Sequence, residues 1–101
     1  METNGVSIVI ATCNLLGFTR LCIDYIRKNT IIPYELVIVD NGSTDGTREY
    51  FGELSKKLDV NYLRNEKNLG PIIAINQGIR ASNILRMANA QRRGYIRKRM
   101  A

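Results

Sequence analysis

The sequence contains no histidine and only two cysteines among 101 residues. Without histidine, a His-based catalytic triad and a histidine general base are excluded, and a zinc site is poorly supported. Cys13 and Cys22 are interpreted as small buried thiols in a reducing compartment. No apolar run approaches the roughly 20 residues that cross a bilayer, and Glu2 stands where a signal peptide would be basic. We therefore expect a cytoplasmic protein without a transmembrane segment.

Acidic residues are missing after Glu66, and this absence explains the net charge of +6. Residues 1–82 carry nine basic and nine acidic residues, whereas residues 83–101 carry six basic residues and no acidic one. The charge therefore describes a tail, and nucleic-acid binding is the less favoured interpretation. Three origins of the tail stay open: a truncation or reading-frame change, a degraded fourth strand, and an evolved basic arm. We assign residues 1–82 to one domain and residues 83–101 to a basic tail of uncertain structure.

Three short β-branched runs alternate with three amphipathic segments. The runs, which are typical of strands, are Val6–Thr12, Glu35–Asp40 and Val60–Arg64. The segments have apolar residues at helical spacing, from about Phe18 to Lys28, after the turn at 41–44, and from Pro71, which suits the first position of a helix. This alternation with short connections predicts right-handed crossovers and a parallel, Rossmann-like sheet with helices on its faces. The expected fold class is therefore three-layer α/β.

Each predicted helix is expected to bury an apolar stripe against the sheet. The stripes are Phe18, Leu21, Cys22, Tyr25 and Ile26 in the first helix, Tyr50, Phe51, Leu54 and Leu58 in the second, and Ile72, Ile75 and Ile79 in the third, with Ala74 and Gly78 as close-packing neighbours. Ser43 or Thr44 is expected to cap the second helix, and Asp45 and Glu49 place negative charge near its start.

Polar residues follow each predicted strand, at the edge of a parallel sheet where ligands bind. The three clusters are Thr12 with Asn14, Asp40–Thr44, and Asn65–Gly70. Their short side chains and glycines let backbone N–H groups approach a ligand, and nearby helix N-termini favour phosphate. Asp40 ends a buried strand, and its carboxylate can accept a hydrogen bond from an imide N–H of a nucleobase or from a ribose hydroxyl. An equally weighted alternative is that Asp40 only closes the Asn-Gly turn.

Three motifs, taken in this order, resemble family 2 glycosyltransferases, which are inverting enzymes of the GT-A fold. The motifs are Val6-Ser-Ile-Val-Ile-Ala-Thr-Cys-Asn14, Val39-Asp-Asn-Gly-Ser-Thr-Asp-Gly-Thr47, and Asn65-Glu-Lys-Asn-Leu-Gly70 followed by Ala74-Ile-Asn-Gln-Gly78. The resemblance covers about residues 5–82, the N-terminal nucleotide-binding half of such an enzyme. The first motif departs from the family at two positions, because Ala11 replaces a usual proline and Cys13 replaces a usual aromatic residue.

The resemblance implies a nucleoside-diphosphate-sugar donor, usually a UDP-sugar, at the carboxyl edge of the sheet. The nucleotide-binding residues that it implies are Thr12, Asn14, Asp40, Ser43, Gly70 and Asn76. Among them, Thr12 and Asn14 would lie against the nucleoside, and Asp40 would contact the base, usually uracil. Asp45 is expected to cap its helix rather than touch the ligand.

The family's metal-binding Asp-x-Asp motif is missing here, since no acidic residue follows Glu66 and Asn89-Ala90-Gln91 stands near its expected place. We therefore assign no metal ligand and no catalytic residue in this chain, and expect Mn²⁺ or Mg²⁺ only in the complete enzyme. The main hypothesis is a truncated nucleotide-sugar-binding portion that binds UDP weakly and transfers no sugar. Under this hypothesis, Asp40→Ala would remove the contact with the base and leave the fold intact. The alternatives are a self-associating α/β module that forms a homodimer and a nucleic-acid binder that acts through the tail.

Overall fold

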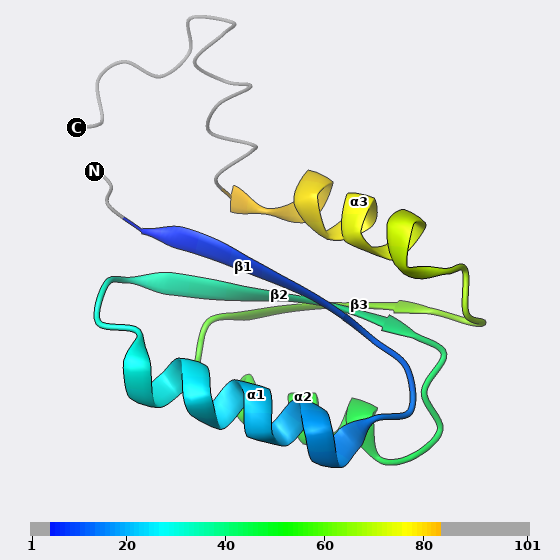
Figure 1. Ribbon diagram of the computed structural model, residues 1–101, viewed down its shortest axis with the longest axis horizontal. Coiled ribbons are helices and arrows are strands. Elements are labelled where there is room, and N and C mark those ends of the chain that lie inside the picture. Colours follow the sequence, from blue (N-terminus) through cyan, green and yellow to red (C-terminus); the bar gives the residue numbers. More distant parts are fainter. Residues whose placement is uncertain (1–4, 84–101) are drawn as a thin grey trace, which may run out of the picture.

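The sheet has three parallel strands, and a helix follows each of them along the chain (Figure 1). The computed structural model describes residues 5–83. Its strands are β1 (Val6–Thr12), β2 (Tyr34–Asn41) and β3 (Val60–Asn65), and its helices are α1 (Leu16–Asn29), α2 (Thr47–Leu54) and α3 (Pro71–Ala81). The α/β fold class predicted from the sequence is confirmed. Apart from Asn83, the basic tail lies outside the described residues, so the domain division after residue 82 stays a prediction.

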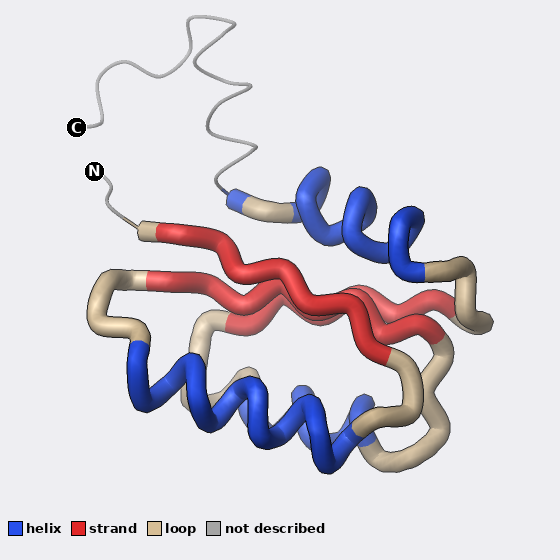
Figure 2. The backbone as a smooth tube through the Cα atoms, in the orientation of Figure 1, coloured by secondary structure: helices blue, strands red, loops and turns tan. Residues whose placement is uncertain are grey.

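The helices form layers on both faces of the sheet. Figure 2 shows α1 and α2 on one face and α3 on the other. The strand order is β1-β2-β3, so β2 is central, and α3 returns from β3 to lie over β1 and β2. Helix α3 therefore covers the face of the sheet opposite to α1 and α2. In open parallel sheets, ligands bind outside the carboxyl ends of the strands.

The core lies around β2. Every residue of Leu36–Val39 is fully buried, because helices cover both faces of this strand. On the α1 and α2 side, Leu36 and Ile38 pack with Ile23 and Phe51. Full burial of a side chain of this size stabilises the fold by about 1.5–3 kcal/mol. The continuous apolar sequence of β2 therefore reflects a strand that has no solvent-facing side.

Helix α1 buries a narrower face than its sequence predicts. Its buried residues are Thr19 and Ile23, whereas Phe18, Leu21 and Tyr25 are 66%, 68% and 70% exposed. The prediction that these last three side chains are buried is wrong. The apolar arc of α1 is wider than the sheet against which it packs, and among the described strands none lies beyond β1 to cover the rest.

Helix α3 packs against the sheet through its smallest residues. Ala74 and Gly78 are buried, and a Cβ atom added to Gly78 would lie only 2.4 Å from Cγ1 of Val9. The three isoleucines that were expected to line the buried face are 76%, 36% and 44% exposed at Ile72, Ile75 and Ile79. That expectation is wrong because the helix approaches the sheet too closely for large side chains, which lie on its flank instead.

The helices are short, with 14, 8 and 11 residues in α1, α2 and α3. Phe51 and Leu54 of α2 are buried as predicted, and Tyr50 and Leu58 are half-buried beside them. No helix within residues 5–83 combines the length and the apolar character needed to cross a bilayer.

Candidate functional site

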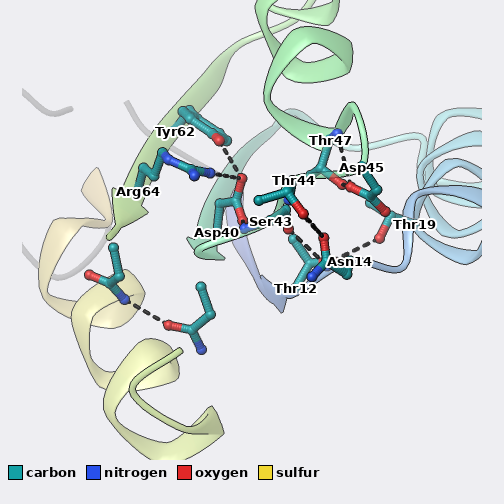
Figure 3. Close-up of polar contacts among 12 residues, drawn as sticks. Thr12, Asn14, Thr19, Asp40, Ser43, Thr44, Asp45, Thr47, Tyr62 and Arg64 are labelled. Carbon is teal, nitrogen blue, oxygen red and sulfur yellow. Dashed lines mark hydrogen bonds and ion pairs between the residues drawn. The ribbon is translucent and has the colours of Figure 1, made fainter. Parts of the chain in front are cut away.

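The strand register brings three polar residues side by side at the carboxyl edge of the sheet. Thr12 of β1 is paired with Asp40 of β2, and Asp40 is paired with Arg64 of β3. Because side chains alternate along a strand, Tyr62 and Arg64 project to the same side of β3. Figure 3 shows both of them directed at Asp40.

Asp40 is fully buried, and both oxygens of its carboxylate have partners. The backbone N–H of Ser43 donates to Oδ1 at 2.9 Å, the Tyr62 hydroxyl donates to Oδ2, and the Arg64 guanidinium donates to Oδ2 at 3.1 Å. Burial alone would raise the pKa of Asp40, but the hydrogen bonds from Ser43 and Tyr62 and the charge of Arg64 lower it below its ordinary value. Asp40 is therefore ionised at neutral pH although it has no exposed surface.

The two oxygens of Asp40 serve different purposes. Oδ1 closes the turn at residues 41–43, as the alternative interpretation of the sequence expected. Oδ2 is not needed for the turn, because its partners are Tyr62 and Arg64 of the neighbouring strand. Sequence reasoning missed these two residues. Their spacing of two indicates a shared face of a strand, but only the pairing of β3 with β2 brings that face to Asp40.

Tyr62 offers a spectroscopic test of this contact. Burial, together with the hydrogen bond to Asp40, raises the pKa of Tyr62 to about 12. In an ultraviolet titration, we expect an ionisation step about two pH units above that of an ordinary tyrosine. Burial also raises the pKa of Tyr50, so the comparison is made in a Tyr50→Phe background. There, Tyr62→Phe should abolish the late step, and the matched control Tyr25→Phe on the exposed side of α1 should keep it. A late step that persists when Tyr62 is replaced in this background would contradict the contact.

Asn14 joins the loop after β1 to the loop after β2. Its backbone N–H donates to Oγ of Ser43 at 2.9 Å, and its Oδ1 accepts the backbone N–H of Thr44 at 2.7 Å. Asn14 has a φ of 54°, in the left-handed region that asparagine tolerates better than most residues. Behind it, the hydroxyls of Thr12 and Thr19 are paired at 3.0 Å and buried. Of the residues predicted to lie against the nucleoside, Asn14 is exposed and Thr12 is not.

Asp45 holds the starts of two helices. Its Oδ1 accepts the backbone N–H of Thr47 at 3.2 Å, and its Oδ2 accepts the backbone N–H of Leu16 at 3.0 Å. The Thr47 hydroxyl also donates to Oδ1, at 2.6 Å. This bond first, and the two backbone bonds with it, lower the pKa of Asp45. The expectation that Ser43 or Thr44 caps α2 is therefore wrong, because the N-cap position is Gly46. Asp45, one residue before it, instead accepts the first backbone N–H of both α1 and α2, where negative charge is favoured.

A third polar cluster connects β2, β3 and α3 on the opposite face of the sheet. Asn65 exchanges hydrogen bonds with Gln77, at 2.8 and 3.0 Å, and also donates to Oδ1 of Asn41 at 2.8 Å. The side-chain amide of Asn41 donates to the Gly70 carbonyl at 3.3 Å. Gly70 is thus tied to the end of β2 close to Asp40, whereas Asn76 is exposed on α3 and outside this network. No local pattern in the sequence predicts the pairing of Asn65 with Asn41 and Gln77, which lie on different elements.

The carboxylates at this edge do not fit a divalent cation. Within residues 5–83, no three His, Cys, Asp or Glu side chains lie close enough to hold a metal ion. The oxygens of Asp40 and Asp45 are already used by the internal donors described above. At this edge the described carboxylates are occupied by internal hydrogen bonds, which leaves no ready-made set of oxygen ligands for such an ion.

Comparison with known proteins gives consistent matches over the described region. The family model for glycosyl transferase family 2 matches residues 7–83. The putative glycosyltransferase EpsH of Bacillus subtilis is 30% identical over 82 residues, which are 81% of this chain and 24% of that protein.

Two solved structures share the fold. The mannosyltransferase PcManGT from Pyrobaculum calidifontis, in complex with GDP-Man and Mn²⁺, matches with a TM-score of 0.66 and 25% identity over 77% of this chain and 24% of that one. TarS of S. aureus (residues 1–349) matches in fold with a TM-score of 0.71 and 24% identity, over 79% of this chain and 25% of that one. The chain thus spans about a quarter of the length of each of these three proteins.

Proposed function

The chain belongs to glycosyltransferase family 2, and from this premise we propose that the carboxyl edge of its sheet binds the nucleotide of a nucleoside-diphosphate-sugar donor, a UDP-sugar in the first place. One observation carries the proposal. An ionised carboxylate, Asp40, stands beside a guanidinium, Arg64, at the end of the central strand, where ligands of parallel sheets bind.

The pair of Asp40 and Arg64 is chemically suited to a nucleobase edge. Oδ2 of Asp40 is an acceptor for the ring N–H of uracil, and Arg64 is a donor for the neighbouring carbonyl oxygen. Guanine presents the same neighbouring N–H and carbonyl, and one matched structure is a complex with GDP-Man. UDP and GDP are therefore the two nucleotides to compare.

Tyr62 competes with the base in this arrangement. Asp40 has no exposed surface, whereas the Arg64 side chain is 21% exposed. A base reaches Arg64 first, and it reaches Oδ2 of Asp40 when the Tyr62 hydroxyl gives up its hydrogen bond. Removal of that hydroxyl is expected to strengthen nucleotide binding.

The remaining predicted residues surround this pair. We propose that Thr12 and Asn14 support the nucleoside, with Ser43 fixing the loop of Asn14. Gly70, with a φ of 90°, leads into the N-terminus of α3, which favours phosphate, and Asn76 lies on the same helix. Cys13 and Cys22 are free thiols, and the cytoplasm is the reducing compartment that we propose for them.

The proposed reaction of the whole enzyme is transfer of the sugar to an acceptor hydroxyl. A carboxylate would take the proton of that hydroxyl as it attacks the anomeric carbon, and the nucleoside diphosphate would leave. In the complete enzyme we propose that Mn²⁺ or Mg²⁺ supports the leaving diphosphate. Because no acidic residue follows Glu66 in this chain, we propose that it binds nucleotide without transferring sugar.

Nucleotide titration followed by NMR tests this function. With UDP in the millimolar range, we expect amide shifts to concentrate at Ser43, Asn14 and Arg64. Arg64→Gln should weaken binding roughly tenfold, which corresponds to the loss of one charged hydrogen bond. Tyr62→Phe should tighten binding severalfold, because Oδ2 of Asp40 becomes available.

The matched control is Arg80→Gln, at the exposed end of α3, which should leave nucleotide binding unchanged. GDP in place of UDP shows which base is preferred. If neither nucleotide causes shifts at millimolar concentration, or if Arg80→Gln weakens binding as much as Arg64→Gln, the proposed site is wrong.

A further inference from the structure

The loop that follows β1 and the loop that follows β2 are bonded to each other at the carboxyl edge of the sheet. Asn14 of the first loop is bonded to Ser43 and Thr44 of the second, at 2.9 and 2.7 Å. Beside these bonds, the N–H of Leu16, the first residue of α1, donates to Oδ2 of Asp45 at 3.0 Å. The bonded residues are 29 or 30 positions apart in the sequence, so these contacts, and not chain connectivity, set how the two loops lie against each other.

Asp45 contributes the charged hydrogen bonds between the two loops. Its Oδ2 accepts the N–H of Leu16, and its Oδ1 accepts both the N–H and the hydroxyl of Thr47. The first N–H groups of a helix have no acceptor within the helix, and a bond from such a group to a carboxylate is roughly twice as strong as a bond between neutral groups. A single side chain therefore holds the start of α1 next to the start of α2.

Asn14 is the residue whose conformation depends on this spacing. It lies two residues before Leu16, and its partner Thr44 lies one residue before Asp45. Its φ of 54° is in the left-handed region, and a residue other than glycine keeps such a conformation only where its surroundings hold it. Figure 3 shows Asn14 bonded to Thr44, with Asp45 directed at the start of α2. Without the carboxylate of Asp45, the loop of Asn14 loses its bond to the α2 side at Leu16.

The same pair of loops is tied to the carboxylate of the candidate site. Ser43 donates its backbone N–H to Oδ1 of Asp40 at 2.9 Å, and its hydroxyl oxygen accepts the backbone N–H of Asn14. Ser43 is buried, so its bond to Asp40 is shielded from water. A shift of the loop that carries Asn14 would therefore also change the bonds of the residue that orients Asp40.

We propose that Asp45 is a positioning residue for nucleotide binding, which holds Asn14 beside the nucleoside and does not touch the ligand itself. The inference rests on the function proposed above, in which Asn14 supports the nucleoside. It predicts an effect of opposite sign to that of charge alone. A carboxylate repels the UDP anion, so the loss of its charge should tighten binding, whereas the loss of a positioning bond should weaken it.

UDP titration of the full chain, followed by NMR, tests this role. Asp45→Asn removes the charge and one acceptor oxygen, and we expect the dissociation constant for UDP to rise about three- to tenfold. The matched control is Glu49→Gln, which removes the same charge from the exposed side of the first turn of α2. Because Glu49 holds neither loop, this variant should leave the dissociation constant unchanged or lower it.

Asp45→Ser is the second variant, for the case that Asp45→Asn does not fold. The serine hydroxyl can still accept the N–H of Thr47, two residues on, but it does not replace the second oxygen, which binds Leu16. It therefore keeps the start of α2 and removes the bond to α1. We expect it to weaken UDP binding by a similar factor to Asp45→Asn.

A double-mutant cycle separates positioning from a general loss of structure. Asn14→Gly removes the side chain and keeps the left-handed φ, which glycine adopts without strain. If Asp45 acts through Asn14, then Asp45→Asn should cause little further loss of affinity in the Asn14→Gly background. An equal loss in both backgrounds, or no loss in the wild-type background, overturns the proposal. If the wild type binds neither UDP nor GDP, the proposed function is wrong and this role is lost with it. If the wild type binds UDP and Asp45→Asn binds it equally well, only the role of Asp45 is wrong.

Discussion

Asp40→Ala is expected to lower the free energy of unfolding by about 3 kcal/mol, which is the lower end of the cost of removing one partner from a buried charge pair. The variant leaves three donors without their acceptor, those of Ser43, Tyr62 and Arg64. Arg64 is partly exposed and can turn to water, so we take the lower end. The whole free energy of unfolding of a domain of this size is about 5–15 kcal/mol. The sequence alone predicted that Asp40→Ala leaves the fold intact. The contacts of Asp40 instead predict that this substitution destabilises the fold.

Urea denaturation of the wild type, Asp40→Ala and Asp24→Ala measures this effect. Asp24 is exposed on α1, and its replacement should change the free energy of unfolding by no more than about 0.5 kcal/mol. If Asp40→Ala costs as little as Asp24→Ala, the carboxylate is not held as described.

The pH dependence of the same measurement follows from two pKa shifts of opposite sign. The pKa of Asp40 is lowered by folding, so its contribution is present above the unfolded value of about 3.9 and is lost as the pH falls through the folded pKa. The pKa of Tyr62 is raised to about 12, so its contribution is present below the unfolded value of about 10 and is lost as the pH rises toward 12. The stability difference between wild type and Asp40→Ala should therefore be flat between about pH 4 and pH 10.

The strands could be predicted from the sequence because consecutive apolar residues indicate a strand that is buried on both faces. Leu36–Val39 is apolar throughout and is covered on both faces, so a local run carries the whole signal. The helix faces carried a weaker signal, since apolar residues cover a wide arc of α1 and only the contact with the sheet selects Thr19 and Ile23. In α3 the small residues Ala74 and Gly78 mark the buried face more reliably than the isoleucines do.

The candidate site could be predicted only in part. Its place at the carboxyl edge follows from strand–helix alternation, and Asp40 was found because it ends a buried run. Arg64 and Tyr62 reach Asp40 through the pairing of β2 with β3, which no local pattern specifies. For the same reason, the sequence could not show that Asp45 accepts the first backbone N–H of two helices whose starts are 31 residues apart, at Leu16 and Thr47.

Gly78→Ala is expected to destabilise the chain by about 1–3 kcal/mol, the usual cost of overpacking a core. The new Cβ would lie 2.4 Å from Cγ1 of Val9 and 3.3 Å from Cγ2 of Val39, and both of these atoms belong to the sheet beneath α3. Helix propensity works in the opposite direction, since alanine is favoured over glycine by about 1 kcal/mol inside a helix. We expect the clash to dominate, because relief requires α3 to move away from two strands at once.

Gly52→Ala is the matched control, because Gly52 lies in α2 and an added Cβ there meets no atom within 4 Å. It should therefore show the propensity gain alone and stabilise the chain by about 0.5–1 kcal/mol. In a double-mutant cycle, Val9→Ala should recover part of the loss in Gly78→Ala, since it removes the methyl group that is contacted. A stabilising Gly78→Ala, or a cycle without coupling to Val9, would contradict the close packing of α3. Because Gln77 and Gly70 are held by the same helix, any outward shift of α3 would also move the polar cluster at Asn65 and Asn41 away from the end of β2.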